Sequence, residues 1–136
     1  MKGGEFMSNV SSKFIHMLSA EALLTSEKKS NDSTHDGILL LTNFGFVYGQ
    51  FSKVEPSDNT NVVNVLLGLR ENFSNKFESE GDTIIGNGSV VVLENAVVKY
   101  TNNMTISMKE IIIFCDDIVG YYPVDLSKFS EQLPQI

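Results

Sequence analysis

The chain has 136 residues, of which 42% are hydrophobic and 20% charged, values typical of one globular domain with a proper core and not of a disordered segment. The formal net charge of −7, with Lys and Arg scattered along the chain, argues against binding to nucleic acids or anionic membranes, because both attract clustered positive charge. The single cysteine, Cys115, excludes an intramolecular disulfide and a cysteine-rich metal site.

The first six residues, MKGGEF, precede a second methionine, Met7. We interpret residues 1–6 as an added leader and residues 7–136 as a single domain. The start of the chain lacks a basic segment followed by an apolar one, and no apolar run reaches the length of a membrane span. We therefore expect an acidic cytoplasmic protein that does not associate with membranes.

The first predicted element is a helix over residues 11–26, which Ser11 or Ser12 can cap. Its apolar side chains fall largely at spacings of three and four: Phe14, Ile15, Met17, Leu18, Ala22 and Leu23. We expect this helix to pack over the end or edge of a barrel. A polar linker follows over residues 27–36, and it places His35 in solvent.

Two strands are predicted next, over residues 38–42 and 46–54, joined by a turn at residues 43–45. Gly49 lies inside the second strand, where a glycine indicates a bulge or a sharp bend at which a barrel closes. A loop follows over residues 55–60, which contain Pro, Ser, Asp and Asn.

The apolar run over residues 61–73 is rich in Val and Leu, and we interpret it as a long third strand, bent at Gly68. The polar segment over residues 74–82 is expected to be flexible. An Asn-Gly turn at residues 86–88 predicts a hairpin between strands at 83–85 and 89–93. Further short strands are expected at residues 96–100, 105–108, 111–114 and 118–122, and Pro123 is expected to end the sheet.

Taken together, these elements predict a mainly β fold: a small antiparallel, strongly bent β-barrel over residues 37–122, with an N-terminal α-helix and a short C-terminal tail. Alternation along the strands predicts the core residues: Leu39, Leu41, Val63, Val65, Leu67, Val91, Leu93, Val97, Ile112, Phe114 and Ile118.

No residues form a recognisable catalytic pattern. Asp116 and Asp117 are adjacent and would point to opposite faces of a strand, so a solvated turn explains them better than acid–base catalysis. With Glu110 and Asp125 they suggest a hard-cation site, but the regular spacing of a calcium loop is absent. We therefore assign no metal ligands.

Nucleophilic catalysis would require a base near a nucleophile. Neither His16, in the predicted helix, nor His35, in the linker, shares a motif with Cys115 or with any serine. Phosphate-binding glycine loops are also absent from the sequence. We therefore expect no catalytic residue, no cofactor and no enzymatic activity.

The first two predicted strands resemble the first motif of the Sm-like (LSm) family, in which two strands flank an Asn-Gly-type turn and a second glycine allows a sharp bend: ILLLTNFGFVYGQF, residues 38–51. Residues 64–67 are similar to the strand that follows in that motif, and residues 89–98 to the second motif. Residues 111–122 are similar to the closing strand of divergent members. The resemblance implies a small barrel preceded by a helix.

The resemblance also implies RNA binding, for which Asn64 is the one matching residue. The Arg-Gly pair of the family's second motif is replaced here by Glu94-Asn95. The resemblance therefore supports the barrel more than it supports RNA binding.

Three functions are compatible with the sequence. The first is a non-enzymatic interaction or scaffold module of unknown partner, self-associating through strand edges as a homo-oligomer. The alternative is an Sm-like RNA-binding protein, although the charge makes nucleic acid an unfavoured partner. An enzyme or small-ligand binder has the least support, because a barrel of this size is filled by its own side chains.

Overall fold

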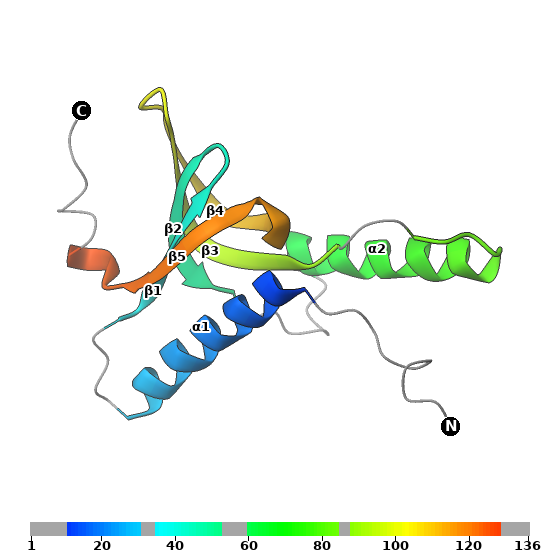
Figure 1. Cartoon of the computed structure of the whole chain (residues 1–136), viewed down its shortest axis with the longest axis horizontal. Coiled ribbons are helices and arrows are strands. Elements are labelled where there is room, and N and C mark those ends of the chain that lie inside the picture. The colour runs from blue at the N-terminus through cyan, green and yellow to red at the C-terminus, as the bar shows by residue number, and fades with distance from the viewer. Residues whose placement is uncertain (1–10, 31–34, 53–59, 85–87, 129–136) are drawn as a thin grey trace.

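The computed structural model describes residues 11–30, 35–52, 60–84 and 88–128. Its elements, in chain order, are α1 (Ser12–Lys29), β1 (Gly37–Thr42), β2 (Gly45–Phe51), α2 (Val62–Ser79), β3 (Val90–Tyr100), β4 (Thr105–Phe114), the 3-10 turn η2 (Cys115–Asp117) and β5 (Ile118–Val124). The strands form one antiparallel sheet in the order β4-β3-β2-β1-β5, shown in Figure 1.

The predicted antiparallel sheet with an N-terminal helix is confirmed. Two other parts of the predicted fold class, the closed barrel and the mainly β content, are not. Within the described residues β4 and β5 lie at opposite edges of the sheet, so the barrel is not closed. Helix and strand contents are nearly equal, at about 40% and 39%, so the fold is not mainly β. The excess of helix comes from α2, which the sequence had indicated as a strand.

Helix α1 forms where the sequence predicts it and runs one turn further, to Lys29. The side chain of Ser11 caps its start by accepting a hydrogen bond from the Phe14 backbone N–H at 3.4 Å. Met17 and Ala20 are its buried residues, and they join the core of the sheet. Figure 1 shows α1 lying along one side of the sheet.

The turn between β1 and β2 depends on Thr42 and Gly45. The Thr42 hydroxyl donates to the Gly45 carbonyl at 2.8 Å and accepts from the Phe44 N–H at 3.3 Å. Gly45 has a φ of 148°, and a side chain there would overlap the backbone carbonyl of Lys99 in β3. Only glycine therefore fits this position without strain.

The irregularity predicted at Gly49 is confirmed as a β-bulge. The register between β2 and β3 shifts between Tyr48 and Gln50. On β3 the bulge places Asn95 at a φ of 51°, and a Cβ on Gly49 would lie 2.9 Å from the Glu94 carbonyl oxygen. The bulge keeps Glu94, Asn95 and the rest of β3 in one strand, where the sequence had indicated an interruption.

The hydrophobic core lies between α1 and one face of the sheet. Its fully buried side chains are Ile38, Leu40, Val47, Leu93, Val98 and Cys115. Of the predicted core residues, Val63, Val91, Leu93 and Ile118 are buried. The prediction was wrong for residues that are half-buried or exposed: Leu39, Leu41, Val65, Leu67, Val97, Ile112 and Phe114.

The error on β1 has a simple cause. The sequence Ile38–Leu41 is apolar at every position, so alternation does not reveal which residues face inwards. Helix α1 determines which face of β1 is buried, because it covers the face that carries Ile38 and Leu40. Leu39 and Leu41 consequently lie on the opposite face, paired with Tyr48 and Phe46 of β2.

The strand predicted over residues 61–73 is wrong, because this segment is the first part of α2. Asn61 caps the helix: its side-chain oxygen accepts from the Asn64 N–H at 2.9 Å. The helix continues to Ser79 through the segment predicted to be flexible. The predicted hairpin is also wrong in its first arm, since Thr83 and Ile84 belong to no strand, whereas residues 85–87 lie outside the described part.

The remaining strands are longer than predicted. Residues 105–108 and 111–114 belong to one strand, β4, and β5 continues to Val124. Pro123 therefore does not end the sheet; it pairs with Ile38 of β1. An edge strand tolerates proline, because the missing N–H can face away from the neighbouring strand.

We expect Gly68→Ala to stabilise the protein by about 0.5–1 kcal/mol, because glycine in a helix loses more backbone entropy on folding than alanine. A Cβ at Gly68 would meet no atom within 4 Å. Thermal or urea denaturation followed by circular dichroism measures the change.

The matched control is Gly45→Ala, which should destabilise the protein because of the positive φ and the Lys99 carbonyl. A Gly68→Ala variant that is less stable than the parent would contradict the helical assignment of this segment.

Candidate functional site

The acidic residues that suggested a cation site do not gather. The Glu110 carboxylate accepts hydrogen bonds from Ser52 Oγ at 3.3 Å and from Asn61 Nδ2 at 3.0 Å. It therefore ties the end of β2 and the cap of α2 to β4. Nowhere in the described part of the chain do three His, Cys, Asp or Glu side chains form a group that could hold a metal ion.

Two other acidic residues stabilise turns. The backbone carbonyl of Asp117, in η2, accepts from the Asn43 N–H at 3.3 Å, and its carboxylate accepts from Asn43 Nδ2 at 3.5 Å. Asp125 follows β5, and the hydroxyl of Ser127 donates to its carboxylate at 2.7 Å. That hydrogen bond lowers the pKa of Asp125 below its ordinary value, helped by the backbone N–H groups of Ser127 and Lys128.

Cys115 is fully buried at the start of η2, and its N–H donates to the Ser89 carbonyl at 2.9 Å. Burial raises the pKa of the thiol, and the negative charge of Asp116 raises it further, while Lys13 acts in the opposite direction. These are the features of a structural thiol and not of an activated nucleophile.

The two histidines anchor α1 to other parts of the chain. His16 shares a hydrogen bond of 2.6 Å with the hydroxyl of Tyr121 in β5. The Nδ1 atom of His35 lies 3.1 Å from the carboxylate of Glu27, also in α1. His35 is half-buried, so the expectation that it is solvated was wrong. The first interaction joins α1 to the edge strand β5, the second joins it to the segment just before β1, and neither places a base beside Cys115.

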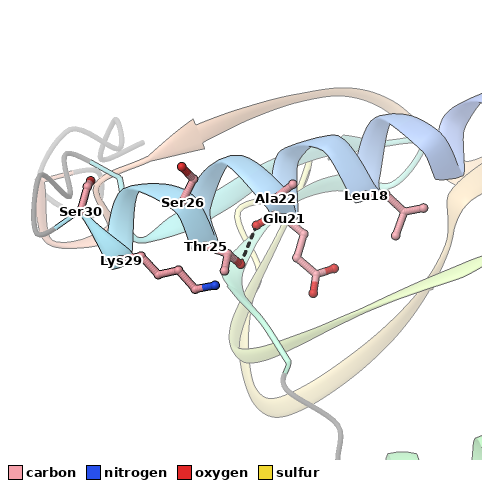
Figure 2. Close-up of a pocket in the computed structure, with 7 residues that line it drawn as sticks. All are labelled: Leu18, Glu21, Ala22, Thr25, Ser26, Lys29 and Ser30. Carbon is pink, nitrogen blue, oxygen red and sulfur yellow. Dashed lines mark hydrogen bonds between the residues drawn. The ribbon is translucent and has the colours of Figure 1, made fainter.

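A hollow of about 700 Å³ lies against α1 and its C-terminal cap, as Figure 2 shows. One helix supplies the whole lining: Leu18, Glu21, Ala22, Thr25, Ser26, Lys29 and Ser30. The hydroxyl of Thr25 bonds to the Glu21 carbonyl oxygen, at 2.9 Å, and so is used within the helix. Because no second element contributes to the lining, the hollow is an open surface and not an enclosed ligand site.

A smaller cleft of about 350 Å³ lies between α1 and the end of the sheet. Its lining mixes charges with two apolar residues: Glu21, Leu24, Thr25, Lys28, His35, Asp36, Gln50, Phe51 and Glu94. The lining contains no nucleophile paired with a base. The cleft could receive a small polar molecule, but its side chains do not converge on a reacting atom.

Exposed apolar residues are the more informative feature of the surface. Along α2 they form a stripe, which we call the α2 stripe: Val62, Leu66, Leu69, Phe73 and Phe77. Their exposed fractions lie between 43% and 69%. Figure 1 shows that α2 projects beyond the end of the sheet. Soluble monomers rarely expose extended apolar patches, so this surface is a candidate for binding another protein.

The sheet face opposite α1 also carries exposed apolar residues. Leu41 lies beside Phe46 in the register of β1 and β2, and Leu39 lies beside Tyr122 in that of β1 and β5. Phe46 is 43% exposed and Tyr122 is 67% exposed. Burial raises the pKa of the neighbouring Tyr48 on the same face. This face is thus apolar at its centre and open at its margins.

Asn64, the residue matched to the RNA-binding asparagine of Sm-like proteins, lies in the first turn of α2 and is half-buried. Its N–H is bonded to Asn61, so its backbone serves the helix cap. The resemblance had implied a strand at this position. Glu94 lies on β3 opposite Gln50 and Glu110. The sequence reasoning missed the α2 stripe, although the spacing 62, 66, 69, 73 and 77 was a readable helical signal.

The chain matches no protein-family model and no curated protein. No described helix combines the length and apolar character needed to span a membrane.

We expect Cys115 to react slowly with a thiol reagent in the folded protein, because it is buried and its raised pKa lowers the thiolate fraction. Labelling followed by intact-mass spectrometry under native conditions tests this expectation. A variant carrying Asn75→Cys on the exposed side of α2 supplies an internal control, which should take one label quickly. Rapid addition of two labels would contradict the prediction and revive a catalytic role for Cys115.

Proposed function

We propose that this protein is a non-enzymatic interaction module that self-associates through the edges of its sheet. The observation that carries the proposal is the open sheet: among the strands that the structure describes, β4 and β5 each have a neighbour on one side only. Unpaired strand edges are templates for pairing with another chain. In this proposal, the β4 edge of one copy pairs with the β5 edge of another.

The two edges differ in how many backbone groups they leave for pairing. β4 spans ten residues. Just before it, the Met104 carbonyl points towards β3, because it accepts from the Tyr100 N–H. Since orientation alternates along a strand, the backbone of Ser107 points away from β3. On β5, the Val124 carbonyl accepts from the Asp36 N–H, so the backbone of Pro123 points outwards. Proline shortens the pairing stretch on that edge, because it has no N–H to donate.

The interior gives independent support to this proposal. No buried side-chain nitrogen or oxygen among the described residues lacks a hydrogen-bond partner, so none is left waiting for a ligand. The buried thiol has a raised pKa, and the histidines are used in structural contacts. An interaction module requires surfaces that can bind a partner. The exposed apolar side chains and strand edges of the described residues are such surfaces.

We expect Ser107→Pro to lower the average mass of the assembly in solution, because it removes one outward N–H from the β4 edge. Ser107→Ala is the matched control and should leave the mass unchanged. Light scattering after size-exclusion chromatography, at several concentrations, measures both. Equal masses for the two variants and the parent would count against association through β4.

RNA binding is a second candidate function. What favours it is the Sm-like resemblance together with a helix that precedes the strands and packs on the sheet. The basic residues of the described part do not cluster in sequence beyond Lys28-Lys29; they are distributed over α1, α2, β3 and β4, with Lys128 after β5. The Lys13 ammonium already donates to the Asp116 carbonyl at 3.0 Å.

We expect no tight binding of single-stranded uridine-rich RNA at physiological salt, because the chain carries a net charge of −7 and Glu94 cannot replace a guanidinium. Fluorescence anisotropy at two salt concentrations tests this. Sub-micromolar binding that weakens steeply with salt would overturn the expectation. A loss of that binding in Asn64→Ala would then assign the contact to α2.

A further inference from the structure

The α2 stripe follows the geometry of a helix-pairing surface. Its members are separated by four, three, four and four residues, so they lie on one side of the helix over four turns. The side of α2 that contacts the rest of the chain is different: Val63 is buried and Leu67 half-buried. At 100° per residue, Val63 lies well away from the centre of the stripe.

The protein itself holds the stripe outwards. Asn61 both caps α2 and donates to Glu110 of β4, and this hydrogen bond fixes the start of the helix against the sheet. Helix α2 contacts β4, and beyond that contact it projects away from the sheet, as Figure 1 shows. The described residues therefore provide no cover for Phe73, which is 56% exposed, or for Leu66, which is 50% exposed.

We infer that the α2 stripe binds the α2 stripe of a second copy of this chain, with the two helices antiparallel. The outer four members of the stripe are symmetric about a point between Leu69 and Arg70, with Leu69 beside that point. A two-fold axis at that point places Val62 opposite Phe77 of the second copy, and Leu66 opposite Phe73. Each aromatic ring then meets an aliphatic side chain, so the combined side-chain volume is similar at both outer pairs of the contact. Identical surfaces that complement each other in this way define an isologous dimer.

The charges select the antiparallel direction. The first turn of α2 has no acidic residue, whereas its last turn carries Lys76 and Glu78 and ends at the C-cap Glu80, so the C-terminal end has a net negative charge. Antiparallel pairing brings this end beside the positive N-terminal end of the other helix. Parallel pairing would bring the acidic ends together, and it would also set Phe77 against Phe77 and Val62 against Val62. The parallel contact would be wide at one end and narrow at the other.

The area available sets the expected strength. The five side chains of the stripe are roughly half exposed, and together they offer on the order of 400–500 Å² of apolar surface per copy. A standard interface buries about 800 Å² per partner. The helix pair is therefore expected to be a weak dimer, populated at micromolar concentrations and above. It uses a surface separate from the strand edges and stands whether or not those edges join copies.

The test is carried out on the full chain with Ser107→Pro present, so that edge pairing does not contribute. Sedimentation equilibrium should show a monomer–dimer equilibrium. Phe73→Glu should raise the dissociation constant at least about tenfold, because a carboxylate would face Leu66 of the second copy at both symmetric contacts. Asn75→Glu, with the same charge change on the same helix but away from the stripe, should leave it unchanged. Circular dichroism verifies that both variants fold.

Disulfide trapping tests the direction of the helices. Leu69→Cys lies beside the two-fold axis and should form a disulfide-linked dimer under mild oxidation, whereas Val62→Cys should not, because it faces Phe77. Efficient linking of both variants would indicate parallel helices and overturn the inference. A protein that stays monomeric in sedimentation up to about 100 μM would overturn it as well. A decrease in the average mass of the assembly caused by Ser107→Pro alone would report on pairing of the strand edges and not on the α2 stripe.

Discussion

The packing of α1 on one face of the sheet is the interaction on which the rest of the structure depends. Met17 and Ala20 join a core in which Ile38, Leu40 and Leu93 are fully buried. The strands have apolar residues on both faces, so the sheet alone does not determine which face is inside. By covering one face, α1 makes the other an outer surface, with Phe46 and Tyr122 exposed on it.

The position of α2 follows from a second, smaller set of contacts. The carboxylate of Glu110 accepts from Ser52 and Asn61, so β4, the end of β2 and the start of α2 meet at one point. This is a polar anchor at one end of a long helix, with Val63 as its buried apolar contact. A helix held mainly at one end gains little from burial against its own domain. Its stability and its apolar stripe are then better explained if another surface covers it.

The described residues that could take part in catalysis have structural roles instead. Groups that could have been reactive are engaged in holding elements together: His16 with Tyr121, His35 with Glu27, and Glu110 with Asn61. The one thiol lies in the core beside Asp116, where burial and charge both oppose its ionisation. Within the described residues, apolar side chains and strand edges remain exposed at the surface. These features support the proposed role as an interaction module.

Local sequence signals determined part of this protein. The cap at Ser11, the tight turn at Gly45 and the bulge at Gly49 were all readable, because each depends on the backbone freedom or hydrogen-bonding capacity of one residue. Cys115 is fully buried, which agrees with the tendency of a lone cysteine in an apolar run to behave as a small hydrophobic residue.

The tertiary structure decided between the helical spacing and the strand-like composition of residues 62–79, and it alone decided the inner face of β1. Val and Leu at six of the first eight positions of α2 fit a strand as well as a helix. The Asn61–Glu110 contact that anchors the helix joins residues 49 apart in the chain. Leu39 and Leu40 are chemically identical, yet one is fully buried and the other is not, because α1 covers only one side. Local pattern specifies what a segment can become, and long-range packing decides which side of it is buried.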